Sequence, residues 1–126
     1  MKQTIDRTYV TLNQAKLLKE KKFDVPCRLC VADDDERALP FNSLVSDLHV
    51  NSRHPYYSAP EQWELAEWLR LNHGIWISVN RDYNDGVFLG YESKIDYTEG
   101  IIDCGTFNTP QEAYSAAFDY VLNNLI

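Results

Sequence analysis

Residues 75–102 read IWISVNRDYNDGVFLGYESKIDYTEGII, and this stretch decides the fold. Its first five residues are mostly β-branched, and alternate apolar side chains point to one side, which predicts a strand. Asn84-Asp85-Gly86 is typical of a tight turn between two strands. Because apolar residues resume at Val87, the pattern predicts a β-hairpin over residues 75–97. A second turn signal, residues 98–100, precedes a further strand at Ile101 and Ile102.

Three helices are expected from the residues that begin them. Each start matches the capping box, which contains two hydrogen bonds. The side-chain oxygen of the first residue accepts from the backbone amide three residues on, and the Glu or Gln side chain at that later position accepts from the backbone amide of the first residue. The three matches are Thr11–Gln14, Ser58–Glu61 and Thr109–Glu112. Two of them carry Pro in the first turn, where the missing N–H costs nothing. The predicted helices cover residues 11–22, 59–73 and 110–124.

The second of these helices is expected to end at Gly74, a residue that adopts the left-handed conformation of a helix C-cap easily. Trp63, Ala66 and Leu69 recur at helical spacing and form its expected core face.

The sequence between the first two helices contains weaker signals of secondary structure. We expect a strand at Cys27–Val31, a solvated acidic turn at Asp33–Glu36, a partner strand within residues 39–50 and a loop at residues 51–58. The expected order is α-β-β-α-β-β-(β)-α. This order predicts one α+β domain over residues 1–126, with an antiparallel sheet of about four strands covered by helices mainly on one face.

Charge and composition exclude several classes of protein. The chain has 126 residues, is 44% hydrophobic and carries a formal net charge of −7. Such an acidic chain is a poor general binder of nucleic acid, whose phosphates require Lys and Arg, and a poor ligand for an anionic membrane. Basic residues concentrate in residues 1–22, and none occurs from Ile95 to the end. Two interpretations fit this distribution. The basic and acidic parts attract each other within the chain, or they form two distinct faces for a partner.

The expected location is the cytoplasm. No apolar run approaches the roughly 18 residues that a membrane helix needs. The first residues lack the apolar stretch of a signal peptide. Three cysteines are too few for a disulfide scaffold.

No cofactor or metal is expected. Cys27-Arg-Leu-Cys30 has CxxC spacing, but a zinc ribbon needs two such pairs, and a redox pair stands at a helix start. We therefore expect buried, reduced thiols. The Gly-x-Ser-x-Gly motif of many hydrolases is missing. A small hydrolase that uses His54 or His73 with a carboxylate remains an alternative.

Aromatic residues provide the candidate binding site. Trp and Tyr often anchor protein interfaces, and they gather around the second helix and the strand after it. We expect Trp68 or Trp76 to be exposed beside a tyrosine, with two glutamates forming a polar rim; a wide core covered by loops is the alternative. The candidate residues are Trp68, Trp76, Tyr56, Tyr57, Tyr83, Glu64 and Glu67.

Three segments together resemble a known group of proteins. They are residues 9–23 (YVTLNQAKLLKEKKF), residues 57–63 (YSAPEQW) with Trp68-Leu-Arg70, and Thr109–Ala113. The set resembles small uncharacterised proteins of bacteriophages and mobile elements of gut-dwelling bacteria. The likeness covers about a third of the chain and departs at Lys22, near which the group has glycine. It implies a viral or mobile-element origin and no catalytic residues.

The sequence thus predicts a non-enzymatic accessory or modulator protein that acts through contact with a protein partner. Direct nucleic-acid binding and membrane binding are not expected. A second hypothesis is an acidic DNA mimic that occupies a basic protein surface, and the small hydrolase is a third.

Overall fold

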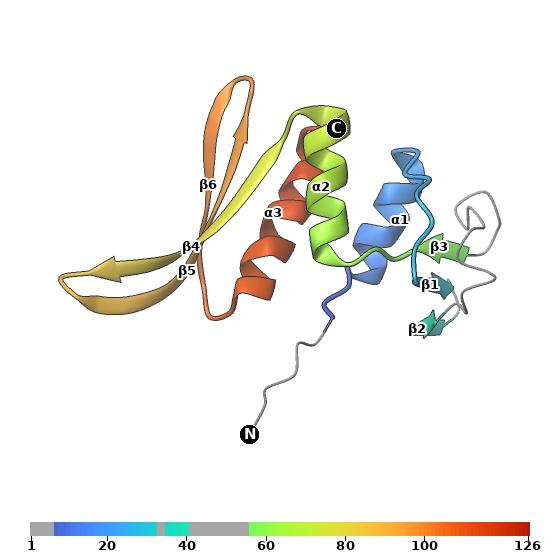
Figure 1. The fold of residues 1–126 in the computed structure, drawn as a ribbon, viewed down its shortest axis with the longest axis horizontal. Coiled ribbons are helices and arrows are strands. Elements are labelled where there is room, and N and C mark those ends of the chain that lie inside the picture. Colours follow the sequence, from blue (N-terminus) through green and yellow to red (C-terminus); the bar gives the residue numbers. More distant parts are fainter. Residues whose placement is uncertain (1–6, 33–34, 41–55) are drawn as a thin grey trace.

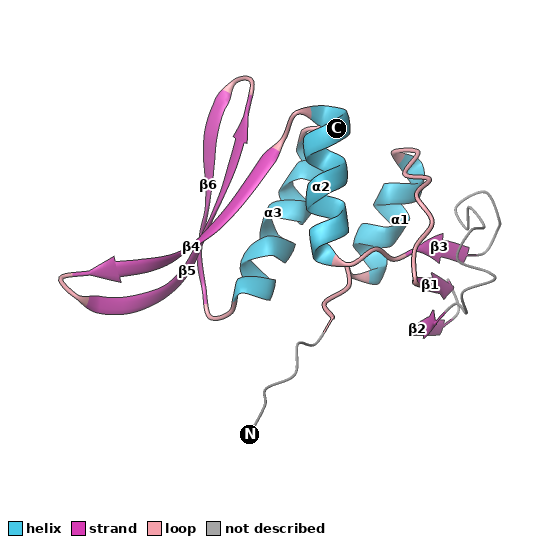
Figure 2. Cartoon of the chain, viewed as in Figure 1, coloured by secondary structure: helices cyan, strands magenta, loops and turns pink. Residues whose placement is uncertain are grey.

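A computed structural model describes residues 7–32, 35–40 and 56–126, with the backbone alone described at residues 32, 35–40 and 56. It confirms the α+β class, but this part of the chain forms two three-stranded antiparallel sheets where a single sheet was expected (Figures 1 and 2). The elements are α1 (Leu12–Glu20), β1 (Leu29–Ala32), β2 (Asp35–Pro40), β3 (Tyr56–Ser58), α2 (Gln62–His73), β4 (Trp76–Asn84), β5 (Val87–Tyr97), β6 (Gly100–Phe107) and α3 (Pro110–Asn124).

The smaller sheet has the order β2-β1-β3 and corrects two expectations. The partner of β1 starts at Asp35, so Asp35 and Glu36 belong to a strand rather than to a turn. Tyr56–Ser58, expected within a loop, pairs with β1. Strand β1 itself starts at Leu29, later than expected. The rest of the expected acidic turn, partner strand and loop lies in residues 33–34 and 41–55, outside the described residues.

The larger sheet has the order β4-β5-β6 and confirms the predicted hairpin. Asp85 and Gly86 both have positive φ, at 50° and 78°, as the two central residues of a type I′ turn require. Strand β6 pairs with β5 only over Tyr91–Tyr97. The outer end of the hairpin therefore extends beyond β6 as a two-stranded arm, visible at the left of Figure 1.

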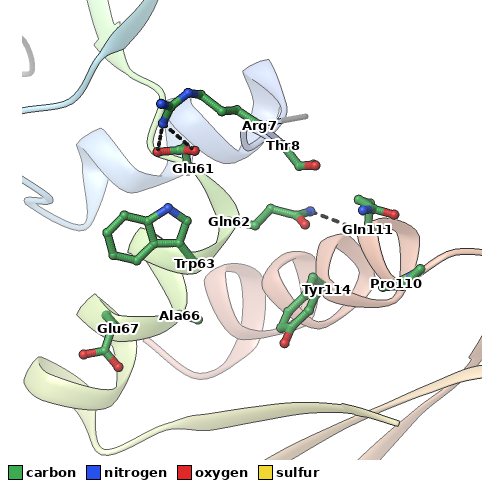
Figure 3. A pocket seen from close by; sticks show the side chains of 10 residues that line it. All are labelled: Arg7, Thr8, Glu61, Gln62, Trp63, Ala66, Glu67, Pro110, Gln111 and Tyr114. Atoms are coloured by element: carbon green, nitrogen blue, oxygen red, sulfur yellow. Dashed lines mark hydrogen bonds and ion pairs between the residues drawn. The ribbon is translucent and has the colours of Figure 1, made fainter. Parts of the chain in front are cut away.

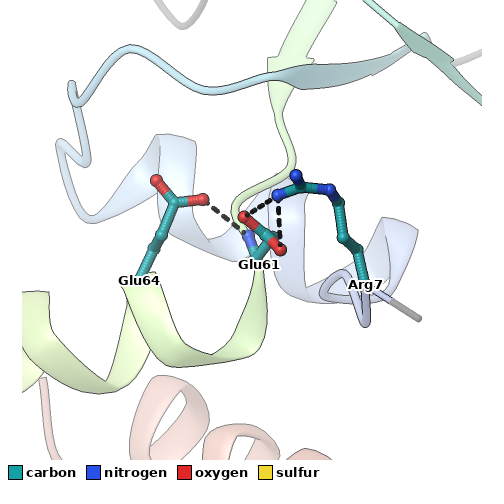
Figure 4. A network of polar contacts seen from close by, with 3 residues as sticks. All are labelled: Arg7, Glu61 and Glu64. Atoms are coloured by element: carbon teal, nitrogen blue, oxygen red, sulfur yellow. Dashed lines mark hydrogen bonds and ion pairs between the residues drawn. The ribbon is translucent and has the colours of Figure 1, made fainter. Parts of the chain in front are cut away.

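The capping prediction is confirmed in full at α1, is confirmed at α3 for the N-cap bond alone, and is wrong at α2. Both bonds of the Thr11–Gln14 box form at α1, and Thr109 Oγ1 accepts from the amide of Glu112 at α3. Helix α2 starts at Gln62 instead of residue 59. Its N-cap is Glu61, and the backbone of Glu61 donates to Glu64 Oε1 (Figure 4).

The backbone just before α2 explains this later start. The Val10 amide donates to the Pro60 carbonyl at 3.0 Å, and the Gln62 amide donates to the Thr8 carbonyl at 2.8 Å. Residues 60–62 are thereby held against the segment before α1 and cannot belong to a helix that starts at Ser58. Arg7 adds an ion pair at 3.3 Å to the nearly buried Glu61 carboxylate (Figure 4).

The core lies where α3 covers one face of the larger sheet, with α1 and α2 packed beside it. Leu65 and Leu69 of α2 are fully buried, whereas Trp63 is 63% exposed. The expected core face of α2 was therefore wrong at Trp63. Since Leu65 and Leu69 share a face four residues apart, the buried stripe runs along their side of the helix, and Trp63 falls on the opposite side. None of the helices in the described residues is long and apolar enough to cross a membrane.

Candidate functional site

The face of the larger sheet that points away from α3 carries the candidate site. Side chains alternate between the two faces along each strand. Ile77, Ile95 and Ile102 are paired across the three strands and pack into the core beneath α3. The neighbouring row, Trp76, Asp96 and Ile101, is therefore on the opposite face, which we call the open face. It also carries Ser78, Lys94, Asp103, Asn80, Glu92, Thr106 and Asp82.

One end of the open face is apolar and exposed. Trp76 and Ile101 are 58% and 68% exposed, and both are paired through Asp96 on the central strand. Strands lie about 4.8 Å apart, so the two apolar side chains flank the carboxylate of Asp96. Large apolar side chains that are exposed at one end of a sheet face, on either side of a charged residue, make that end a candidate binding surface.

Trp76 is held from one side by α2. The Arg70 guanidinium lies 5.2 Å from the centre of the Trp76 ring, a cation–π distance. Nε and Nη2 of Arg70 donate to the two oxygens of Glu67 at 2.9 and 2.7 Å. These hydrogen bonds lower the pKa of Glu67 and raise the pKa of Arg70. Glu67 therefore fixes Arg70, and Arg70 in turn orients the exposed indole.

The remainder of the open face is acidic. It carries four carboxylates, on Asp82, Glu92, Asp96 and Asp103, and one ammonium group, on Lys94. Lys94 forms an ion pair with Glu92 at 3.7 Å. Within the described residues, no cation forms an ion pair with Asp96 or Asp103. Lys94 is paired with Glu92, and the Arg70 guanidinium against Trp76 is paired with Glu67, so the carboxylate of Asp96 leaves the exposed end around Trp76 negatively charged.

The structure does not gather the predicted aromatic residues into one patch. Trp76 and Tyr83 lie at opposite ends of β4, and Tyr57 lies on the smaller sheet, with the Lys19 ammonium 4.9 Å from its ring centre. Tyr83 contacts Phe88 on the arm at 5.5 Å. The backbone of Tyr56 is in β3, and its side chain lies outside the described residues.

Of the two tryptophans of which one was expected to be exposed, Trp76 is the exposed one, and Trp68 is covered by other rings. Its ring makes an edge contact with the buried Phe23 at 5.1 Å and with His73 at 4.9 Å. It packs against the core and is partly buried. Of the two rim residues, Glu67 reaches Trp76 through Arg70, whereas Glu64 closes the capping box of α2 and faces another part of the molecule.

The hydrolase alternative names His54 or His73 together with a carboxylate. Apart from its contact with the Trp68 ring, His73 has no ion pair with any carboxylate among them, and His54 lies outside the described residues. They also contain no group of His, Cys, Asp and Glu suited to hold a metal ion. Cys27 and Cys30 are buried free thiols. Burial is the main cause that raises the pKa of Cys27 to about 12, so this thiol stays protonated at neutral pH.

Sequence reasoning missed Ile101, Asp96 and Asp103 as members of the site. The signal that could have found them is the turn at residues 98–100, which sets the register of β5 with β6 and therefore determines which residues share a face with Trp76. Comparisons with family models, with curated proteins and with solved structures found no match for this chain.

Proposed function

We propose that the chain is a non-enzymatic accessory or modulator protein and that its open face binds a basic surface on a protein partner. The observation that carries this proposal is the row of Trp76, Asp96 and Ile101, in which two exposed apolar side chains flank an unpaired carboxylate. Apolar anchors within a charged rim are the usual anatomy of a protein interface.

Charge favours a basic partner. Asp96 and Asp103 remain uncompensated among the described residues, and the whole chain carries a net charge of −7. A partner with Lys or Arg opposite these carboxylates gains both affinity and a faster encounter. The resemblance of the helix starts to phage proteins supports a setting in a phage or mobile element of a gut bacterium. The unpaired thiols of Cys27 and Cys30 support a cytoplasmic location.

The DNA-mimic hypothesis uses the same face. Its carboxylates supply the negative charge that a DNA-binding protein recognises on phosphates. Competition separates the two forms of the proposal. If double-stranded DNA displaces the chain from its partner, the chain mimics DNA; if the partner binds both at once, the chain is a modulator of another kind.

Charge reversal tests the proposal. The partner is captured from an extract of a gut bacterium, and its affinity is then measured for the original chain and for Asp96→Lys with Asp103→Lys. The double variant should bind at least about tenfold more weakly, and raising the salt concentration should weaken only the original chain markedly. Glu99→Lys with Glu112→Lys, at exposed positions outside the open face, is the control. Equal losses in both double variants would refute a contact through the open face.

A further inference from the structure

A second site lies between the first turns of α2 and α3. A groove of about 640 Å³ opens there, within the size range of ligand clefts. Figure 3 shows Trp63 of α2 and Tyr114 of α3 on its two sides, with Gln62 and Ala66 between them. The small side chain of Ala66 leaves the space between the two rings open.

Two aromatic rings and one proline ring form part of the walls of the groove, beside polar and charged side chains. Trp63 is 63% exposed although it stands on a helix whose other face is fully buried. Tyr114 is stacked on the buried Phe118 at 6.1 Å, which holds its ring in place, and Pro110 lies on the same side of the groove. Rigid rings on either side of a cleft form good surfaces for flat, apolar ligand groups.

Three side chains of the groove have N–H groups that take part in no hydrogen bond within the described residues. In the described part of the chain, the Trp63 indole N–H has no hydrogen-bond partner. Gln62 donates one side-chain N–H to the Gln111 carbonyl at 3.1 Å, which leaves its second N–H available. Arg7 engages Glu61 through Nη1 alone. A ligand that fits these N–H groups supplies carbonyl oxygens to accept from them.

An anion does not fit this groove well. Two of its lining side chains, Glu61 and Glu67, are carboxylates, and Glu61 already neutralises Arg7. A neutral ligand that combines acceptors with apolar rings fits the unused N–H groups and the exposed rings of the groove. A proline-rich segment has these properties, because proline has no backbone N–H and the extended polyproline II helix exposes its carbonyls together with apolar rings.

We propose that this groove binds a proline-rich segment of another protein in the polyproline II conformation. Proline rings pack against Trp63 and Tyr114, and the segment's carbonyls accept from the Trp63 indole and the free Gln62 N–H. Aromatic-lined grooves recognise such segments with a small entropic cost, since the ligand is already extended. The site shares no residue with the open face, but the two are connected, because Glu67 lines the groove and binds Arg70, which contacts Trp76.

A decaproline peptide titrated into the isotope-labelled chain tests the proposal. The Trp63 indole N–H and the Gln62 side-chain N–H signals should shift, and a Gly-Ser peptide of the same length should leave them unchanged. Trp63→Ala should weaken binding about tenfold or more. Ala66→Leu, which fills the space between the rings, should weaken it as well. Trp76→Ala is the matched control, because Trp76 is similarly exposed but lies outside the groove.

Four outcomes would overturn the proposal. They are no shift at peptide concentrations of about 10 mM, equal shifts with the Gly-Ser peptide, equal shifts with acetate or phosphate, and equal weakening by Trp76→Ala. Thermal melting of each variant checks its fold. Since the Trp63 side chain is largely exposed, its truncation should leave the melting temperature nearly unchanged.

Discussion

Arg70 connects the carboxylate of Glu67 to the exposed ring of Trp76: its guanidinium lies 5.2 Å from the ring centre while Nε and Nη2 donate to both Glu67 oxygens. The contact joins the last turns of α2 to the first residue of β4. It limits the number of conformations that the indole samples. A restrained aromatic side chain loses less entropy when a partner binds it.

This relationship predicts a pH effect. The hydrogen bonds from Arg70 hold the pKa of Glu67 below its ordinary value, so in an NMR titration the Glu67 carboxylate should titrate at a lower pH than an unpaired glutamate. A lowered pKa means that the contact stabilises the fold at higher pH and that its contribution is lost as pH falls through the folded-state value. In Arg70→Gln, the titration of Glu67 should return toward its ordinary value. An unchanged titration in that variant would contradict the assignment.

Lys22 offers a stabilising substitution. It has a φ of 64° just after α1, in the left-handed region that costs a residue with a side chain roughly 1–2 kcal/mol. Lys22→Gly should therefore raise the free energy of unfolding by about 1 kcal/mol, measured by urea denaturation. Lys21→Gly is the control, because Lys21 has a φ of −86° and should gain nothing. A destabilised Lys22→Gly variant would show that this turn does not require the left-handed conformation.

Gly90 should not tolerate alanine. Its φ is 140°, and an added Cβ would lie 2.6 Å from the Phe107 carbonyl oxygen and 2.9 Å from Cγ2 of Thr106. Gly90→Ala should destabilise the fold by at least about 2 kcal/mol, because it combines backbone strain with a clash. Gly100→Ala is the control: its φ is 130°, but no atom lies within 4 Å of the added Cβ. The smaller loss is expected for Gly100→Ala in the same urea experiment, and equal losses would contradict the close approach at Gly90.

Cys27 should resist modification in the folded chain. Thiol reagents attack the thiolate, and burial raises the pKa of Cys27 to about 12. At pH 8, mass spectrometry should find Cys104, which is only partly buried, labelled before Cys27. Denaturant should make the two thiols react at similar rates. Rapid labelling of Cys27 without denaturant would mean that the segment before β1 opens easily.

The local signals in the sequence predicted the local parts of the fold. The turn at Asp85-Gly86 and the start of α3 at Pro110 depend on residues close together in the chain, and both appear where expected. Strand β3 was missed because its three residues are ordered by pairing with β1, which is a contact distant in sequence. The start of α2 was misplaced for a similar reason, since residues 8–10 hold the backbone before it.

The candidate site was predicted only in part. The sequence indicated an exposed tryptophan near a glutamate, and Trp76 with Glu67 fits that expectation. It could not indicate which flank of α2 meets Phe23, so Trp63 was expected in the core and Trp68 remained a candidate for the surface, whereas Trp68 contacts Phe23 and Trp63 is exposed. Helical periodicity locates an apolar stripe, but the neighbouring elements decide which of its edges is covered.

The central claim is that the open face contacts the basic partner. Trp76 and Trp63 are a matched pair for testing it, because both indoles are exposed and they lie at different sites. The most direct measurement is the affinity of the captured basic partner for Trp76→Ala and for Trp63→Ala, with the melting temperature of each variant as a check. We predict that Trp76→Ala weakens binding by about tenfold or more and that Trp63→Ala leaves it unchanged. If Trp76→Ala binds the partner as tightly as the original chain does, the open face is not the contact surface.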